Sequence, residues 1–345
     1  MEQFYERKEI SKDTVELKIT IPKDSFKDSY NILLKDHLKD TSVKGFRKGK
    51  VPTDLLESDL KGELKIETLD KLAPLYINTA IQKENIEPIA PPTYKELPKL
   101  EDDKDVVFTI EITVLPEFKL GNMKKIKIEK EEVKITKAEI DTALEEIKKN
   151  RETKTKEVND KWAVEIAEML KIEKVKDLES LKKYIKEALK KQKEHMFLHK
   201  REEEALVQAI SLSKIEIPLP AVKFEASERE RSFIYDMQQR GIKPEEFIKT
   251  QNLTIEKMRE LWEKDAREAL ETDVFLKIYK KENKLSVSEA ELNERIEQIK
   301  KSAPKDMDTS VYDDPKWREY VQSVYEKEKA FDHFRKEVLG DIHKD

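Results

Sequence analysis

The chain has 345 residues, of which 41% are charged and 37% are apolar, and its net charge is −5 at pH 7. About 25% charged is usual for a globular protein. A general nucleic-acid-binding protein is usually strongly basic, so the net charge argues against that class. The chain has no cysteine, which excludes disulfide scaffolds, cysteine-ligated zinc, iron–sulfur clusters and thiol catalysis. Six glycines, with no G-x-G-x-x-G or P-loop motif, argue against most nucleotide-binding enzymes.

The hydropathy pattern contains no membrane or secretory segment. A transmembrane helix needs about 18 consecutive apolar residues, and the sequence has no such run. Residues 1–7 lack the apolar stretch of a secretory signal. We therefore expect a cytoplasmic protein.

Residues 1–116 predict a mixed α and β region. Apolar and polar residues alternate over 15–21 and over 106–114, which is typical of half-buried strands, and residues 2–10 should pair with the first of these strands. A helix capped by Asp24 should run to about Lys39.

A second helical stretch is expected from about Thr53 to Glu84. Gly62 interrupts its pattern and could break it, and the prolines at 88, 91 and 92 should end it.

The rest of the chain predicts an extended segment followed by helices. Residues 117–135 look extended, and Thr136 with Glu139 forms a capping-box pattern. Later apolar spacings of three and four predict long helices. The expected helices cover residues 137–150, 178–211, 221–240, 253–283, 288–302 and 315–339. The fold class is therefore α+β, with a small N-terminal α+β domain and an elongated, mostly α-helical C-terminal domain with protruding arms.

A basic loop is expected between the first two helices. No acid occurs between Asp40 and Asp54, but four bases do, together with two glycines, Phe46 and a proline. Cations and an exposed aromatic ring suit an RNA-rich or acidic docking surface. The residues alone leave open a second interpretation, in which the loop is a solvated turn and Phe46 folds back on its own helix.

This loop resembles the ribosome-binding signature G-F-R-x-G-K-x-P of the trigger factor family of bacterial chaperones. Residues that match the signature or accompany it are Lys44, Gly45, Phe46, Arg47, Lys48, Gly49, Lys50 and Pro52. The resemblance covers nearly the whole chain, closely in residues 1–116 and more loosely afterwards. It implies a ribosome-binding domain at 1–116, an extended linker and helix at 117–158, and a helical chaperone body with arms at 159–345.

The sequence departs from the family at one point. Full-length trigger factors carry an FKBP-type prolyl-isomerase domain after the linker, whereas here Glu157-Val158-Asn159 runs almost directly into helix. We therefore expect an ATP-independent chaperone that needs no cofactor and is not an enzyme. The alternatives are a prolyl isomerase like full-length members, or a helical structural adaptor.

The resemblance also implies partners. These are the large ribosomal subunit at its exit site (a ribosomal protein and adjacent rRNA), nascent and unfolded chains, and a second copy of this chain off the ribosome. Most apolar residues of the helical body are expected to pack inside it, but a minority could contact clients. The candidates for client binding are Met196, Phe197, Phe233, Tyr235, Met237, Tyr312 and Trp317.

Two other patterns are weak signals for metal binding. His195 and His199 have i, i+4 spacing, which lets two imidazoles share a metal, but no third ligand is evident. The acidic tract 101–105 lacks the remaining ligand positions of a calcium loop and is interpreted as a hairpin turn. We therefore expect a solvated helix face at the histidines and no metal.

Overall fold

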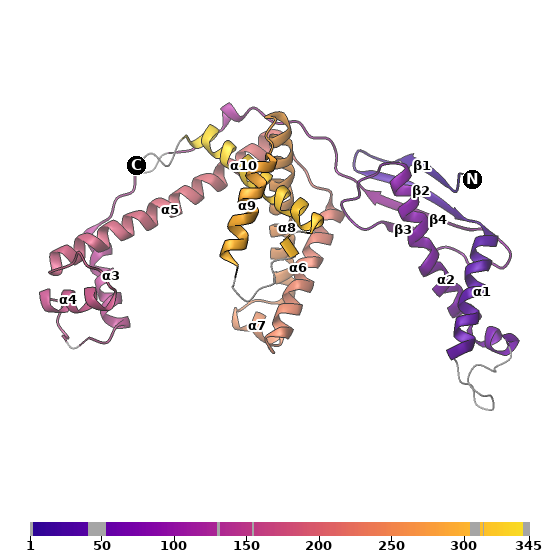
Figure 1. Cartoon of the computed structure of the whole chain (residues 1–345), viewed down its shortest axis with the longest axis horizontal. Helices are drawn as coiled ribbons and strands as arrows, with labels where there is room; N and C mark the ends of the chain where they lie inside the picture. Colours follow the sequence, from indigo (N-terminus) through magenta and orange to yellow (C-terminus); the bar gives the residue numbers. More distant parts are fainter. Residues whose placement is uncertain are drawn as a thin grey trace. The chain divides into compact units, whose positions relative to one another are not determined.

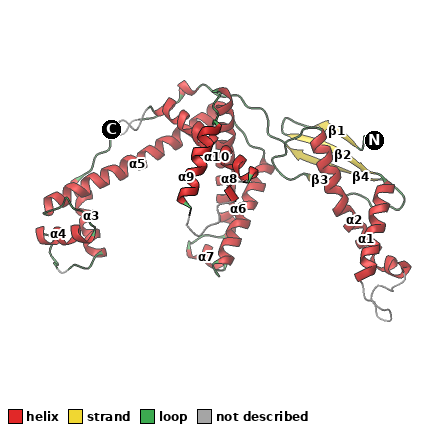
Figure 2. Ribbon diagram, viewed as in Figure 1, coloured by secondary structure: helices red, strands yellow, loops and turns green. Residues whose placement is uncertain are grey.

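The computed structural model describes residues 3–40, 53–129, 132–153, 155–303, 311–312 and 314–340. The described strands all lie in the N-terminal third, and most of the described residues after position 136 are helical (Figures 1 and 2). The strands are β1 (Tyr5–Glu9), β2 (Thr14–Ile21), β3 (Thr93–Glu96) and β4 (Val106–Thr113). The helices are α1 (Lys23–Asp40), α2 (Thr53–Lys83), α3 (Lys137–Asn150), α4 (Asp160–Met169), α5 (Leu178–Ser213), α6 (Leu219–Gln239), α7 (Pro244–Thr250), α8 (Ile255–Glu282), α9 (Glu289–Ser302) and α10 (Pro315–Leu339).

The four strands form one antiparallel sheet in the order β1-β2-β4-β3. Leu17 lies opposite Ile110, and Ile19 lies opposite Phe108. Alternate side chains of a strand point to opposite faces, so the period-2 pattern puts these residues on one buried face. The expected pairing of the N-terminal segment with residues 15–21 is confirmed.

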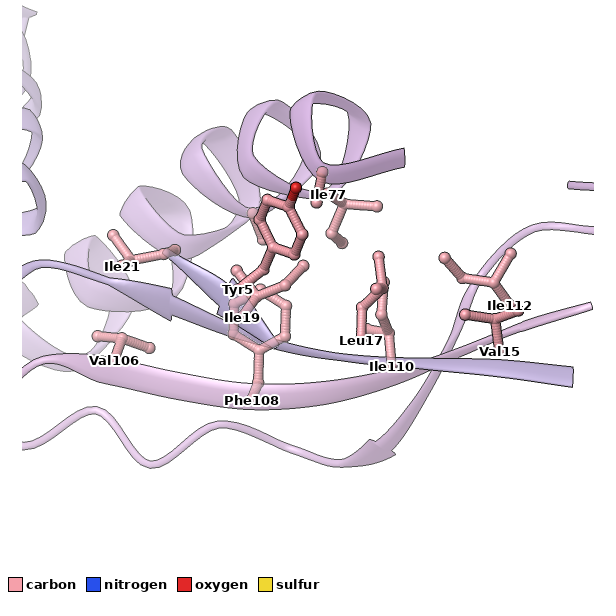
Figure 3. Packing of buried hydrophobic residues seen from close by; sticks show 12 residues of the cluster. Tyr5, Val15, Leu17, Ile19, Ile21, Ile77, Val106, Phe108, Ile110 and Ile112 are labelled. Atoms are coloured by element: carbon pink, nitrogen blue, oxygen red, sulfur yellow. The ribbon is translucent and has the colours of Figure 1, made fainter. Parts of the chain in front are cut away.

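Helix α2 covers the buried face of this sheet. Figure 3 shows Ile77 directed from the helix toward the apolar side chains of the central strands. Leu17, Ile19 and Ile110 are fully buried there, together with Ala80 of the helix. A sheet with one apolar face needs such a cover to exclude water, so α2 and the strands share one core.

Helices α1 and α2 pack against each other through a second, smaller core. It contains the buried residues Tyr30, Leu33, Leu34 and Leu64. Tyr30, Leu33 and Leu34 of α1 have helical spacings of three and four, so they share one face of that helix.

The start of α1 differs from the sequence expectation. Asp24 lies inside the first turn, because the helix already begins at Lys23. The backbone N–H of Lys23 instead donates a hydrogen bond to Oδ1 of Asp105, at 2.8 Å. The cap therefore comes from a residue 82 positions away, which local sequence patterns do not reveal.

Two further expectations about helices were incomplete. Helix α2 passes through Gly62 and Pro74 without a break. A short helix, α7, lies between α6 and α8, where the sequence indicated none. Phe247 of α7 packs near Phe233 of α6, with ring centroids 5.9 Å apart.

The linker lies along α5, and its described residues are extended apart from one 3-10 turn, η1 (Met123–Lys125). The N–H of Gly121 donates to Oγ of Ser213 at 3.0 Å. The side chain of Gln208 bonds both the N–H and the C=O of Lys127, at 3.0 and 2.9 Å. Outside its 3-10 turn, the linker cannot pair its own backbone groups as a helix does, so α5 supplies partners for part of it.

Among its described residues, the helical part has apolar clusters in at least two places. One joins α3, α4 and α5 around Trp162, Ile166 and Leu181, which are almost fully buried. Another joins α9 and α10 around Ile296 and Val321. The capping box of Thr136 and Glu139 is confirmed at the start of α3.

By its internal contacts the chain forms two compact units, residues 1–118 with 216–271 and residues 119–215 with 272–345. None of the described helices combines the length and the apolar composition needed to cross a membrane.

Candidate functional site

The predicted ribosome-binding loop lies outside the described residues. Lys44, Gly45, Phe46, Arg47, Lys48, Gly49, Lys50 and Pro52 all fall in this segment. The structure does describe the two helices that the segment joins. Their shared core of Tyr30, Leu33, Leu34 and Leu64 fixes one helix against the other.

A side-chain hydrogen bond adds to this packing on the same pair of helices. Nε2 of His37 in α1 lies 2.7 Å from Oε2 of Glu67 in α2. Hydrogen bonds from His37 and then Lys71 hold the pKa of the Glu67 carboxyl below its ordinary value. Glu67 therefore stays charged at neutral pH.

The acidic turn between β3 and β4 is held by α2. Nζ atoms of Lys61 and Lys65 lie 2.7 and 2.6 Å from the Asp102 carboxylate, and Lys65 also donates to the C=O of Leu100 at 2.9 Å. The hydrogen bonds from Lys61 and Lys65 lower the pKa of Asp102 to about 2. The turn thus connects the sheet to α2, in agreement with its interpretation as a hairpin turn.

A hollow of about 430 Å³ lies beside this turn. Five lysines and five acidic residues line it, together with Phe26, Tyr30 and Asn31. Because the charges balance, the hollow has no net preference for an anion or a cation.

The predicted client-binding residues have very different exposures. Met196 of α5 and Tyr235 of α6 are each 64% exposed. Phe197, Phe233 and Trp317 are half-buried.

Two of the predicted client-binding residues require a correction, because they are buried. Met237 and Tyr312 are only 5% and 8% exposed, so no client can reach them in this structure. The Tyr312 ring packs on Trp317, with centroids 4.6 Å apart. The sequence shows that these residues are apolar or aromatic, but it does not show which of them other parts of the chain cover.

Helix α10 carries an exposed apolar stripe that is not among the residues predicted above. Tyr320 is 66% exposed and Val324 is 37% exposed, and with Trp317 they follow helical spacings of three and four. Residues so spaced share one helix face. Val321, one position further, is buried against Leu292 and Ile296 of α9. The periodicity could have revealed the stripe, but only the packing shows that Tyr320 and Val324 stay exposed, whereas Trp317 packs partly against the α9–α10 cluster.

Comparison with known proteins gives consistent results in both halves of the chain. Residues 4–147 match the family model "Bacterial trigger factor protein (TF)", and residues 177–334 match "Bacterial trigger factor protein (TF) C-terminus".

Individual relatives agree with the family models. The trigger factor of Halothermothrix orenii is 24% identical, with 86% of this chain and 89% of the relative covered. The trigger factors of Actinobacillus succinogenes and Bacillus licheniformis are 36% and 32% identical over 39% of this chain. These two alignments span only 31% and 32% of the relatives' own lengths.

A solved structure has a related fold. It is described as "Promiscuous Substrate Recognition in Folding and Assembly Activities of the Trigger Factor Chaperone". It matches with a TM-score of 0.55 and 18% identity, and the match covers 96% of this chain and 100% of the other. At this identity the likeness concerns the fold alone.

The small α+β domain, the extended linker and the helical body define a class, that of ribosome-associated molecular chaperones. Within that class, this chain belongs to the trigger factor family.

The isomerase domain of full-length members has no counterpart between the two matched regions. Only residues 148–176 separate them, and they contain the end of α3 and all of α4. Segments below about 40 residues rarely form a stable core of their own. The alignment with the Halothermothrix orenii relative spans 390 positions, more than the 345 residues of this chain, so that relative has a segment missing here.

Proposed function

We propose that this chaperone docks at the ribosomal exit site through residues 44–52 and shields emerging chains with exposed apolar side chains of its helical part. The observation that carries the proposal is the signature of residues 45–52 between two helices that are packed together. Membership of the trigger factor family also supports the ribosome as the partner. We also propose that the docked chain contacts rRNA and that the chain forms a homodimer when it is not bound to the ribosome.

The chemistry of docking follows from the residues of the signature. Arg47 and Lys48 supply positive charge for phosphates or carboxylates, and Phe46 supplies apolar contact area. Interactions between exposed charges weaken as salt is added. Docking should therefore be salt-sensitive.

Co-sedimentation with bacterial ribosomes tests this proposal. The native chain should pellet with ribosomes at low salt and progressively less as salt increases, whereas Phe46→Ala/Arg47→Ala/Lys48→Ala should remain in the supernatant. A matched control is Lys95→Ala, which removes a lysine that pairs with Glu16 on the sheet. Absence of native binding, or equal loss in the control, would favour the structural adaptor instead.

We propose that clients contact the exposed residues Met196, Tyr235, Tyr320 and Val324. The half-buried residues Phe197, Phe233 and Trp317 would contribute the exposed part of their rings. Exposed apolar side chains mark interaction sites when they gather on a surface. Weak contacts of this kind protect unfolded segments from association. No step of this mechanism requires ATP or a cofactor.

We also propose that the chain does not catalyse prolyl isomerisation and that it acts in the cytoplasm, where ribosomes make its clients. The short interval between the two family matches supports the first point. A proline-peptide assay should show the uncatalysed rate, which is slow enough to measure directly. An isomerisation rate well above the rate in buffer alone would favour the prolyl isomerase alternative.

A further inference from the structure

Two histidines on α5 lie close enough to act together. Nε2 of His195 lies 3.2 Å from Nε2 of His199, and their rings are nearly perpendicular, at 80°. The side chain of His199 is 62% exposed, and His195 is exposed as well. Solvent therefore reaches both imidazole rings.

The other nitrogen of His199 identifies its tautomer. Nδ1 lies 3.1 Å from Oε2 of Glu202, and a carboxylate only accepts hydrogen bonds. Nδ1 of His199 must therefore carry the proton. In the neutral ring this leaves a lone pair on Nε2, directed toward His195.

Glu202 is itself held in place. It is 7% exposed, and its Oε1 lies 3.3 Å from Nη1 of Arg335 on α10. Arg335 also pairs with Asp332 at 3.0 Å. A buried carboxylate that accepts the second ring N–H of a histidine is the arrangement usually found behind metal-binding histidines, because it fixes the ring and raises its basicity.

We propose that His195 and His199 form a binding site for a late first-row divalent metal such as Ni²⁺ or Zn²⁺. A metal–imidazole bond is about 2.0–2.1 Å long, so two such bonds place the nitrogens roughly 2.9 Å apart at a right angle and about 3.3 Å apart at the tetrahedral angle. The observed 3.2 Å lies within that range. Imidazole ligands favour zinc, copper and nickel over magnesium.

Binding requires one proton rearrangement. In the metal-free chain, Nε2–H of His195 donates to the lone pair of His199. The metal takes the place of that proton, and the neutral His195 ring then carries its proton on Nδ1, so both Nε2 lone pairs face the ion.

The site contains two protein ligands. Among the described residues, no group of three or more histidine, aspartate or glutamate side chains is arranged to hold a metal. Water or another molecule must complete the coordination, so affinity should be weaker than at a closed structural site. The bound ion would connect two successive turns of α5.

Isothermal titration calorimetry of the full-length, tag-free chain with Ni²⁺ tests the proposal. We expect one saturable site per chain and no comparable binding of Mg²⁺. His195→Ala, His195→Gln and His199→Ala should each weaken Ni²⁺ binding at least tenfold. His37→Ala, which removes a histidine from α1, is the matched control and should bind as the native chain does.

Two further measurements distinguish this site from nonspecific binding of Ni²⁺ to other histidines. Glu202→Gln should weaken Ni²⁺ binding by roughly 10-fold to 100-fold, as removal of such a supporting carboxylate does. Ni²⁺ should raise the melting temperature of the native chain and not that of His199→Ala, because a ligand of the folded state stabilises it. No saturable native binding, or native binding retained in both His195 variants, would overturn the proposal.

Discussion

Gly62 and Gly121 show how a single residue type has opposite roles at two positions. A Cβ added at Gly62 would meet nothing within 4 Å, whereas one at Gly121 would lie 2.5 Å from the carbonyl carbon of Leu212. Glycine inside a helix lowers stability, because the unfolded chain has more conformations to lose. Gly62 therefore weakens α2 without serving its packing, and Gly121 permits a close approach.

Gly62→Ala should stabilise the protein by about 0.5–1 kcal/mol, because alanine fits the helical conformation and restricts the unfolded chain. Urea unfolding monitored by circular dichroism measures the change. A decrease in the unfolding midpoint would contradict the continuous course of α2.

Three carboxyl groups should make stability depend on pH in the acid range. Hydrogen bonds led by those from Lys61, Lys193 and Lys329 lower the pKa values of Asp102, Glu139 and Glu291, respectively, to about 2. Because these folded-state values lie below the unfolded ones, the carboxylates stabilise the protein above about pH 4.5, and this contribution is lost as pH falls toward 2.

The triple variant Asp102→Asn/Glu139→Gln/Glu291→Gln should accordingly lose less stability than the native chain between about pH 5 and pH 3. Urea unfolding midpoints at several pH values measure the slope. Glu319→Gln, an exposed acid on α10, serves as the control and should keep the native slope. Parallel slopes for the triple and native chains would contradict the assigned ion pairs.

At the scale of elements, the linker depends on α5 for its course. Gly121 and Lys127 bond to Ser213 and Gln208, while Nζ of Lys193 reaches the C=O of Lys134 at 3.2 Å. These contacts are spread along much of α5. The helix therefore supports a segment whose described residues pair with no strand.

Gly121→Ala should detach the start of this linker, because the new Cβ would collide with backbone atoms rather than with a flexible side chain. Hydrogen exchange measured by mass spectrometry should become faster at residues 119–127, and stability should fall. Gly62→Ala is the matched substitution and should leave exchange at the linker unchanged. Native exchange rates in Gly121→Ala would refute the close packing.

At the scale of the whole molecule, the high charge content coexists with exposed apolar side chains. With 41% charged and 37% apolar residues, the chain keeps many solvated faces, and the exposed Tyr320 and Val324 stand out on α10. Such a surface can contact apolar segments of clients while charged neighbours maintain solubility.

Tyr320→Ser/Val324→Ser should weaken suppression of aggregation of an unfolded client. Losing ~1 kcal/mol of contact free energy raises a dissociation constant roughly fivefold, so more chaperone should be needed for half-maximal protection. Light scattering during dilution of a denatured client measures this, with Glu319→Gln as the control. Equal protection by the double variant and the control would exclude Tyr320 and Val324 as client contacts.

Local sequence patterns predicted much of the fold. Period-2 alternation located β2 and β4, helical spacing located most of the long helices, and the Thr136–Glu139 pattern marked the start of α3 correctly. These features depend on backbone geometry and on neighbours within one or two turns. The basic loop signature likewise needs only adjacent residues, so the sequence by itself was sufficient to indicate the family.

Only the tertiary structure decided which side chains are covered and which distant groups meet. Asp105 caps α1 from 82 positions away, Met237 and Tyr312 are buried, and Tyr320 remains open. The orientation of His199 also depends on Glu202 and, through it, on Arg335 of another helix. Periodicity assigns a residue to a face of its own element, but the packing of other elements determines whether that face meets water, a partner or a ligand.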